Sequence, residues 1–282
     1  MSAGMRIPTW LKLLALTGLY AALLSVDYTS ATLSAAASTT PIQLVAAAIV
    51  DTILLSYFVI SSRFSVRKEW GALFALLFGM VYMLTAIESV YLGSVLAAST
   101  IPPILVNGGI TSAIYAAALV WAFGGHAREV GGSRLKLPPR EWAWKIVLLS
   151  GTYLILFILF GLIVYAPLGK ALDPAGYASE QATASSAAAL VFPVELIRGA
   201  LWALLAIPAI LSLPFDWKKT GLIVGLLMAV PLTMVLFQTN SMSIGLQVGH
   251  AAEIFGENLV FGVATVWILK ARHRLASIGE TG

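Results

Sequence analysis

Residues 246–270 read LQVGHAAEIFGENLVFGVATVWILK, an apolar run of helical length that contains a few ionisable side chains. About 20 consecutive apolar residues are enough to cross the hydrocarbon core of a bilayer as a helix. The run ends at Lys270, and two further basic residues, Arg272 and Arg274, follow it. A long apolar segment that stops at positive charge is typical of a membrane span whose end faces the cytoplasm.

The composition of the whole chain is that of an integral membrane protein. Hydrophobic residues make up 59% of the 282 residues, and charged residues make up only 11%. Because a soluble domain carries about a quarter charged residues, this chain could not cover a water-facing surface. It contains no cysteine, which excludes disulfides, thiolate metal sites and Fe–S clusters. We therefore expect an all-α fold, a polytopic membrane helix bundle.

Eight stretches of the chain have the length and apolar character of membrane-spanning helices. They lie near 9–26, 42–62, 70–93, 103–124, 143–167, 187–212, 220–238 and 246–270. Because the number is even, both termini are expected on the same side of the membrane. The sequence predicts a single integral membrane domain over 1–282, which a basic connection could divide into halves 1–124 and 142–282.

The positive charges fall on one side of this eight-span topology. Of the 17 Lys and Arg residues, all except Lys170 and Arg198 belong to segments on that side. They are Arg6, Lys12, Arg63, Arg67, Lys68, Arg128, Arg134, Lys136, Arg140, Lys145, Lys218, Lys219, Lys270, Arg272 and Arg274. Cytoplasmic segments of membrane proteins carry such an excess, so we expect a cell-membrane protein with cytoplasmic termini. This bias also accounts for the net charge of +4, so nucleic acid is not an expected partner.

A few ionisable residues interrupt the apolar spans and have no topological explanation. They are Asp51, Glu88, Glu195, Arg198, His250, Glu253 and Glu257. A charged side chain at the centre of a bilayer costs about 2.5–3.5 kcal/mol even on the most lenient scale. We therefore expect these groups to point into the bundle, where pairing, protonation, water or a bound cation neutralises them.

The last span has the clearest polar pattern. His250, Glu253 and Glu257 recur at i, i+3 and i+7, which places them on one face of a helix. Gln247 extends this face, and Asn258 lies beside it. Three ionisable groups on one face of one span favour a functional site over a packing feature.

The sixth span adds an acidic and a basic residue. Glu195 and Arg198 are spaced at i and i+3, as an internal ion pair would be. A comparison of depths places both of them, together with Asp51, Glu88 and the polar face of the last span, in the outer half or the middle of the membrane. We expect them to line one polar cavity that opens outward. The longest external connection, about 168–186, is expected to be a short polar loop.

The ligand types limit the chemistry of this cavity. His250, Glu253 and Glu257 form a candidate site for a divalent metal such as Zn²⁺ or Mn²⁺, because imidazole and carboxylate suit these ions. One intramembrane histidine is too few for bis-histidine haem ligation. The chain also lacks a nucleotide-binding motif and a Gly-x-Ser-x-Gly elbow. No catalytic residue can be named.

Three functions remain open from the sequence. In a proton- or cation-coupled transporter, Asp51, Glu88, Glu253 and Glu257 would bind the ion or relay protons. In a membrane-embedded, metal-dependent hydrolase or transferase, Glu253 or Glu257 would act as general base and His250 as metal ligand or acid. In an accessory or scaffold subunit, the polar groups would only specify packing. The transporter is favoured because no complete catalytic set is visible, so the expected partners are the lipid bilayer and a small ion or small-molecule ligand.

Overall fold

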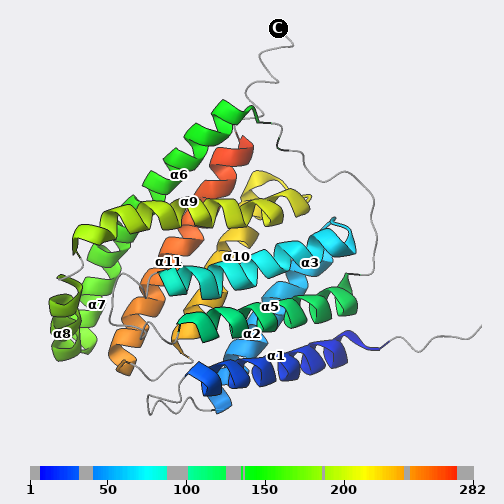
Figure 1. Cartoon of the computed structure of the whole chain (residues 1–282), viewed down its shortest axis with the longest axis horizontal. Coiled ribbons are helices and arrows are strands. Elements are labelled where there is room, and N and C mark those ends of the chain that lie inside the picture. The colour runs from blue at the N-terminus through cyan, green and yellow to red at the C-terminus, as the bar shows by residue number, and fades with distance from the viewer. Residues whose placement is uncertain are drawn as a thin grey trace, which may run out of the picture.

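The computed structural model describes residues 7–31, 41–87, 101–124, 135, 137–185, 188–237 and 242–271. Within these ranges the chain forms helices and no strands (Figure 1). The helices are α1 (Thr9–Ala31), α2 (Pro41–Ser61), α3 (Val66–Phe74), α5 (Ile101–Phe123), α6 (Pro139–Phe160), α7 (Ala166–Leu172), α8 (Pro174–Ser185), α9 (Ala188–Ser212), α10 (Trp217–Leu236) and α11 (Ile244–Val266). Three π-helical segments continue α3, α6 and α11, namely η1 (Ala75–Met83), η3 (Gly161–Tyr165) and η4 (Trp267–Ala271).

Among the described residues, seven helical segments are long and apolar enough to cross a membrane. They are Pro41–Ser61, Val66–Ile87, Ile101–Phe123, Pro139–Leu172, Ala189–Ser212, Trp217–Leu236 and Ile244–Lys270. The first of the eight expected spans corresponds to α1. Its apolar part, Thr9–Ser25, is shorter than the seven segments named above. Large apolar side chains such as Trp121 and Ile42 remain exposed on the outside of the bundle, where lipid can cover them. The polytopic membrane helix bundle expected from the sequence is confirmed, and its helix count is close to the expected eight.

Hydrogen bonds tie several basic ends of the helices together at one end of the bundle. The Arg63 amide donates to the Ser212 carbonyl at 2.9 Å, which joins the end of α2 to the end of α9. The Lys12 ammonium of α1 donates to the Ala122 carbonyl of α5 at 2.7 Å. The Lys270 ammonium donates to the Leu213 carbonyl, which lies between α9 and α10, at 3.3 Å. These contacts place basic residues from the first, second and last spans at the same end, as an alternating topology requires.

Glycine contacts hold α11 in a defined orientation. A Cβ atom on Gly262 would lie 2.4 Å from the Cα of Gly225, so α10 and α11 meet backbone to backbone. On another side of α11, a Cβ atom on Gly245 would lie 2.9 Å from the carbonyl oxygen of Leu172 at the end of α7. Small residues allow this close approach in membrane bundles. Since α11 is held on two sides, the direction of its polar face is also determined.

The prediction of an external loop over 168–186 is wrong, because most of this segment is helical. α7 extends to Leu172, and α8 follows after one intervening residue. Asp173 caps α8, since its carboxylate accepts a hydrogen bond from the Gly176 amide at 3.0 Å. Pro174 occupies the first helical position, where a missing N–H costs nothing. The small polar residues resemble a loop, but alanine, glutamate and glutamine are also good helix formers.

The orientation of the bundle can be tested by labelling single cysteines, because the chain has no native cysteine. Ser65 precedes α3 at the basic end, and its side chain makes no capping hydrogen bond. Ala178 is exposed on α8 at the opposite end. A membrane-impermeant maleimide applied to intact cells should label Ala178→Cys, and it should label Ser65→Cys only after permeabilisation. The reverse pattern would show that the basic end faces outward.

Candidate functional site

The polar residues of α11 face the interior of the bundle. Gln247, Glu253, Glu257 and Asn258 are all buried, although they lie on a helix that is otherwise mostly apolar. α11 packs against α10 on one side and against α6, η3, α7 and α9 on others. The carboxylates of this helix are therefore shielded from lipid, as the cost of intramembrane charge requires.

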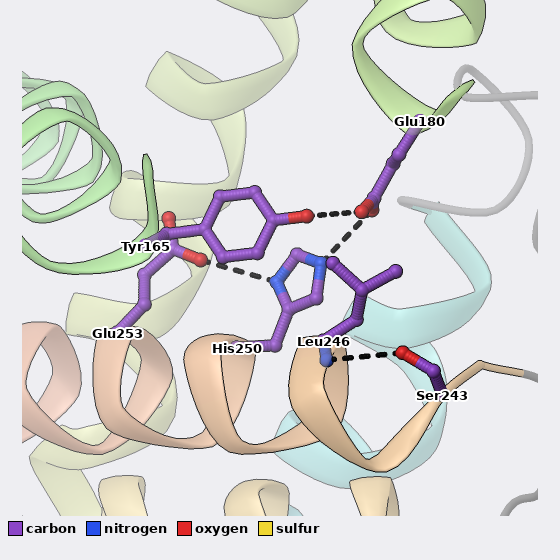
Figure 2. Close-up of polar contacts among 6 residues, drawn as sticks. All are labelled: Tyr165, Glu180, Ser243, Leu246, His250 and Glu253. Atoms are coloured by element: carbon purple, nitrogen blue, oxygen red, sulfur yellow. Dashed lines mark hydrogen bonds and ion pairs between the residues drawn. The ribbon is translucent and has the colours of Figure 1, made fainter. Parts of the chain in front are cut away.

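His250 lies between two carboxylates that come from different helices (Figure 2). Its Nδ1 atom is 3.1 Å from Oε2 of Glu253, one turn further along α11. Its Nε2 atom is 2.9 Å from Oε1 of Glu180, which belongs to α8. Only the doubly protonated imidazolium can donate from both nitrogens at once. The arrangement thus favours a positively charged ring between two negative groups.

Tyr165, the last residue of η3, completes this group. Its hydroxyl donates a hydrogen bond to Glu180, and its ring stacks on that of His250 with centroids 4.0 Å apart. Figure 2 shows the hydroxyl and the imidazole converging on the same carboxylate. The four side chains of Tyr165, Glu180, His250 and Glu253 are named here the histidine group.

The histidine group runs from the surface into the protein. The exposed fraction of the side chain falls from 38% at Glu180 to 21% at His250 and 9% at Glu253. Glu257 lies one turn beyond Glu253 on the same face of α11 and is buried. The order along this polar track is therefore Glu180, His250, Glu253 and Glu257, with its open end at α8.

The π-helical segment η3 and two glycines explain how these helices approach so closely. A Cβ atom on Gly161 would lie 3.3 Å from Oε1 of Glu253, and one on Gly249 would lie 3.3 Å from the Tyr165 ring. Larger residues at either position would push α11 away from η3. Single π-helical turns are frequent at functional sites, because they redirect side chains within a helix. Here the turn ends at Tyr165, the residue that stacks on His250.

A second set of hydrogen bonds fastens α8 to the start of α11. The Ser243 hydroxyl donates to the Asp173 carboxylate. It also accepts from the Leu246 amide at 3.3 Å, the contact drawn in Figure 2. The hydrogen bond from Ser243, with that from the Gly176 amide, holds the pKa of Asp173 below its usual value. α8 thus has polar attachments at Asp173 and at Glu180, in addition to the packing of Tyr177 on the Tyr165 ring.

Glu180 has a lowered pKa for a related reason. Burial raises the pKa of this carboxyl, but the hydrogen bond and charge of His250 and the hydrogen bond from Tyr165 outweigh burial. The result is a pKa below the ordinary value of 4.5. A group with a pKa lower in the folded than in the unfolded protein stabilises the fold above its unfolded pKa. That contribution is lost as the pH falls through the folded pKa.

We expect Glu180→Gln to lower the free energy of unfolding at pH 7 by about 1 kcal/mol, a size typical of partly exposed charge pairs. The difference from the wild type should shrink as the pH falls below 4.5, where the wild-type carboxyl also becomes neutral. Thermal unfolding of both proteins in detergent between pH 7 and pH 3 measures this. A difference that stays constant over this range would show that charge at Glu180 does not hold α8.

Glu195 and Arg198 form the ion pair that their spacing predicts. Oε1 of Glu195 and Nη1 of Arg198 are 2.8 Å apart, and both side chains are almost fully buried. The Arg198 guanidinium lies 5.9 Å from the centre of the Tyr153 ring on α6, and Tyr153 meets Phe261 of α11 edge to face. Phe261 lies one turn beyond Glu257 on the same face of α11. The ion pair is therefore connected through the Tyr153 ring to the turn of α11 that follows Glu257.

Replacing one partner of this ion pair should lower the free energy of unfolding more than replacing both partners. Arg198→Met leaves a buried carboxylate without its partner, which typically costs about 3–5 kcal/mol. The double variant Glu195→Met/Arg198→Met should recover more than half of that loss, because no unpaired charge remains. Thermal unfolding of the single and double variants measures the difference. A double variant as unstable as Arg198→Met alone would mean that further contacts of the two residues dominate.

The expected cavity residues come from different parts of the bundle. Asp51 lies on α2, which packs against α1, α5 and α10, whereas α11 packs on α10 and on the helices beyond it. α10 is thus the helix that packs against both α2 and α11. Glu88 lies outside the described residues. Conversely, Glu180 and Tyr165 belong to the site although the sequence did not single them out. The sequence did contain one signal for Glu180: it is an acidic residue in the connection that lies at the same end of the bundle as the start of α11.

The candidate metal ligands occupy this same track. Within the described part of the chain, no three or more His, Asp or Glu side chains are grouped as metal ligands usually are. Each nitrogen of His250 faces a carboxylate, so a metal bound there would need Glu180 or Glu253 to move. Metal binding by His250, Glu253 and Glu257 stays a prediction.

Fold and site together define a polytopic integral membrane protein with a carboxylate–imidazole track that starts at the surface and ends inside the bundle. No known protein family matches the chain, and no curated protein or solved structure is significantly similar to it. The functional argument therefore rests on the geometry of the site.

Proposed function

We propose that the protein is a proton- or cation-coupled transporter whose external entrance lies at α8. The observation that carries this proposal is the order of the track, in which a histidine bridges a half-exposed carboxylate and a buried one. Such intramembrane acids and histidines mark ion or proton pathways in membrane proteins. The apolar outer surface of the bundle supports this proposal, because an ion pathway through the protein would let an ion pass a hydrocarbon barrier.

The distances within the track suit proton transfer. Glu180 would exchange protons with external water. His250, charged in this arrangement, would release its Nδ1 proton to Glu253 and then take a proton on Nε2 from Glu180. Both contacts are close to 3 Å, which is within hydrogen-bond reach. Imidazole is well suited to this role, because its unperturbed charge change falls near neutral pH. Glu257, one turn further in, would receive the proton next.

A substrate site is proposed beside the inner end of the track, between α6, α9 and α11. Arg198 is the buried cation in this region, and its partner Glu195 neutralises it in the described state. Protonation of Glu195 would free the guanidinium for an anionic group on a substrate. The charge state of the track and the binding of substrate would then be coupled through neighbouring groups.

The geometry favours a transporter over the metal-dependent hydrolase. In a hydrolase, Glu253 or Glu257 would activate water, and His250 would ligate the metal or act as an acid. The two short contacts of His250 instead connect it to carboxylates on both sides, which is an arrangement for passing protons. A scaffold role would require only buried pairs, yet the track reaches the surface at Glu180.

Glu253→Gln should abolish proton-coupled flux while the protein still folds, because glutamine keeps the shape of the side chain but cannot exchange a proton. Proteoliposomes with a trapped pH indicator report the flux when amino acids, sugars, carboxylates, organic cations or nucleosides are added outside. Asp216→Asn is the matched control, since Asp216 is an exposed helix cap and asparagine caps equally well. The proposal fails if Glu253→Gln supports the same flux as the wild type.

A further inference from the structure

Asp51 is a buried carboxylate that the polar track does not use. It lies in the middle of α2 and is only 1% exposed. Among the described residues, no group donates a hydrogen bond to its Oδ1 atom. An unsatisfied buried oxygen costs about 1–3 kcal/mol, and more when it is charged. A ligand at this position would remove that cost.

Other oxygen atoms lie at the same depth as Asp51. Asp51 is ten residues before the end of α2, Leu227 is ten residues after the start of α10, and Ser112 is eleven residues before the end of α5. These three helix ends lie at the basic end of the bundle (Figure 1), and α2 packs on both α5 and α10. At 1.5 Å per residue, the layer lies about 15 Å below that end, near the middle of a hydrocarbon core about 30 Å thick.

Two of these oxygens, those of Ser112 and Leu227, lack a usual hydrogen-bond partner. Ser112 is buried, and its hydroxyl has no hydrogen-bond partner within the described ranges. Pro231 has no N–H, so the Leu227 carbonyl lacks its usual i+4 amide donor. On the neighbouring turn, the hydroxyls of Thr52 and Tyr115 lie 2.5 Å apart and join α2 to α5. The layer thus contains one carboxylate together with neutral hydroxyl and carbonyl oxygens.

We propose that Asp51 binds a sodium ion at this layer, separate from the histidine group. Oxygen ligands without nitrogen or sulfur favour hard cations. One carboxylate balances one monovalent charge, whereas a divalent ion would leave a positive charge uncompensated in the membrane interior. In transporters, backbone carbonyls that an interrupted helix leaves without donors coordinate sodium, and the Leu227 carbonyl is an oxygen ligand of the same chemical type. Sodium binding at Asp51 stands on this geometry alone; the ion's role in coupling rests on the proposed transport function.

Sodium binding can be measured on the purified full chain in detergent. Thermal unfolding is followed from 0 to 200 mM NaCl, with choline chloride keeping the ionic strength constant. A ligand that binds only the folded protein raises the Tm with concentration. We expect this rise in the wild type and in Glu253→Gln, and its loss in Asp51→Asn. Ser112→Ala should shift the sodium dependence to at least tenfold higher concentration.

Two results would overturn the sodium site. One is a wild-type Tm that does not respond to sodium, which would mean that a proton neutralises Asp51. The other is an unchanged response in Asp51→Asn. If Asp51→Asn does not fold, Ser112→Ala decides, and an unaltered sodium dependence there overturns the proposal. Sodium binding without any solute-dependent flux would contradict the transport function and leave the Asp51 site intact.

Discussion

The cost of placing charge in hydrocarbon is the constraint on which this structure depends. Each ionised group within a span costs several kcal/mol unless protein, water or a ligand replaces its hydration. Arg198 meets this constraint with Glu195 on its own helix, and His250 meets it with carboxylates on two helices. The helices must therefore pack so that their polar faces meet, and the glycine contacts of α11 make that packing close enough.

Helix α8 extends the buried polar face of α11 to the surface of the protein, where Glu180 is partly exposed. Without Glu180, the outer nitrogen of His250 would end at the surface without a partner from the protein. The two polar attachments of α8, at Asp173 and Glu180, are the kind of contact that solvent and pH can weaken. An apolar attachment would be stronger in water and would not respond to ions. The position of α8 thus connects the stability of this end of the bundle to the charge of the site.

Much of the fold could be predicted from the sequence, and less of the site. Apolar length and the distribution of basic residues identified the spans, because the bilayer imposes both. The spacing of Glu195 and Arg198 predicted their contact, since neighbours at i and i+3 touch within one helix. The segment 168–186 was misread, because its small polar residues suit both a loop and a helix. Glu180 was consequently missed as the outer partner of His250.

The spacing of residues along the sequence therefore determined which residues share a helix face, because this relation follows from the geometry of a single helix. Only the tertiary structure decided which faces meet. The sequence suggested one cavity for Asp51 and the α11 acids, because all of them are intramembrane acids at similar depth. Depth alone does not decide which helices are neighbours. α2 packs on α5 and α10, whereas α11 packs on the other helices around α10. The partner of a buried charge on another helix depends on helix packing, and no spacing within one helix encodes it.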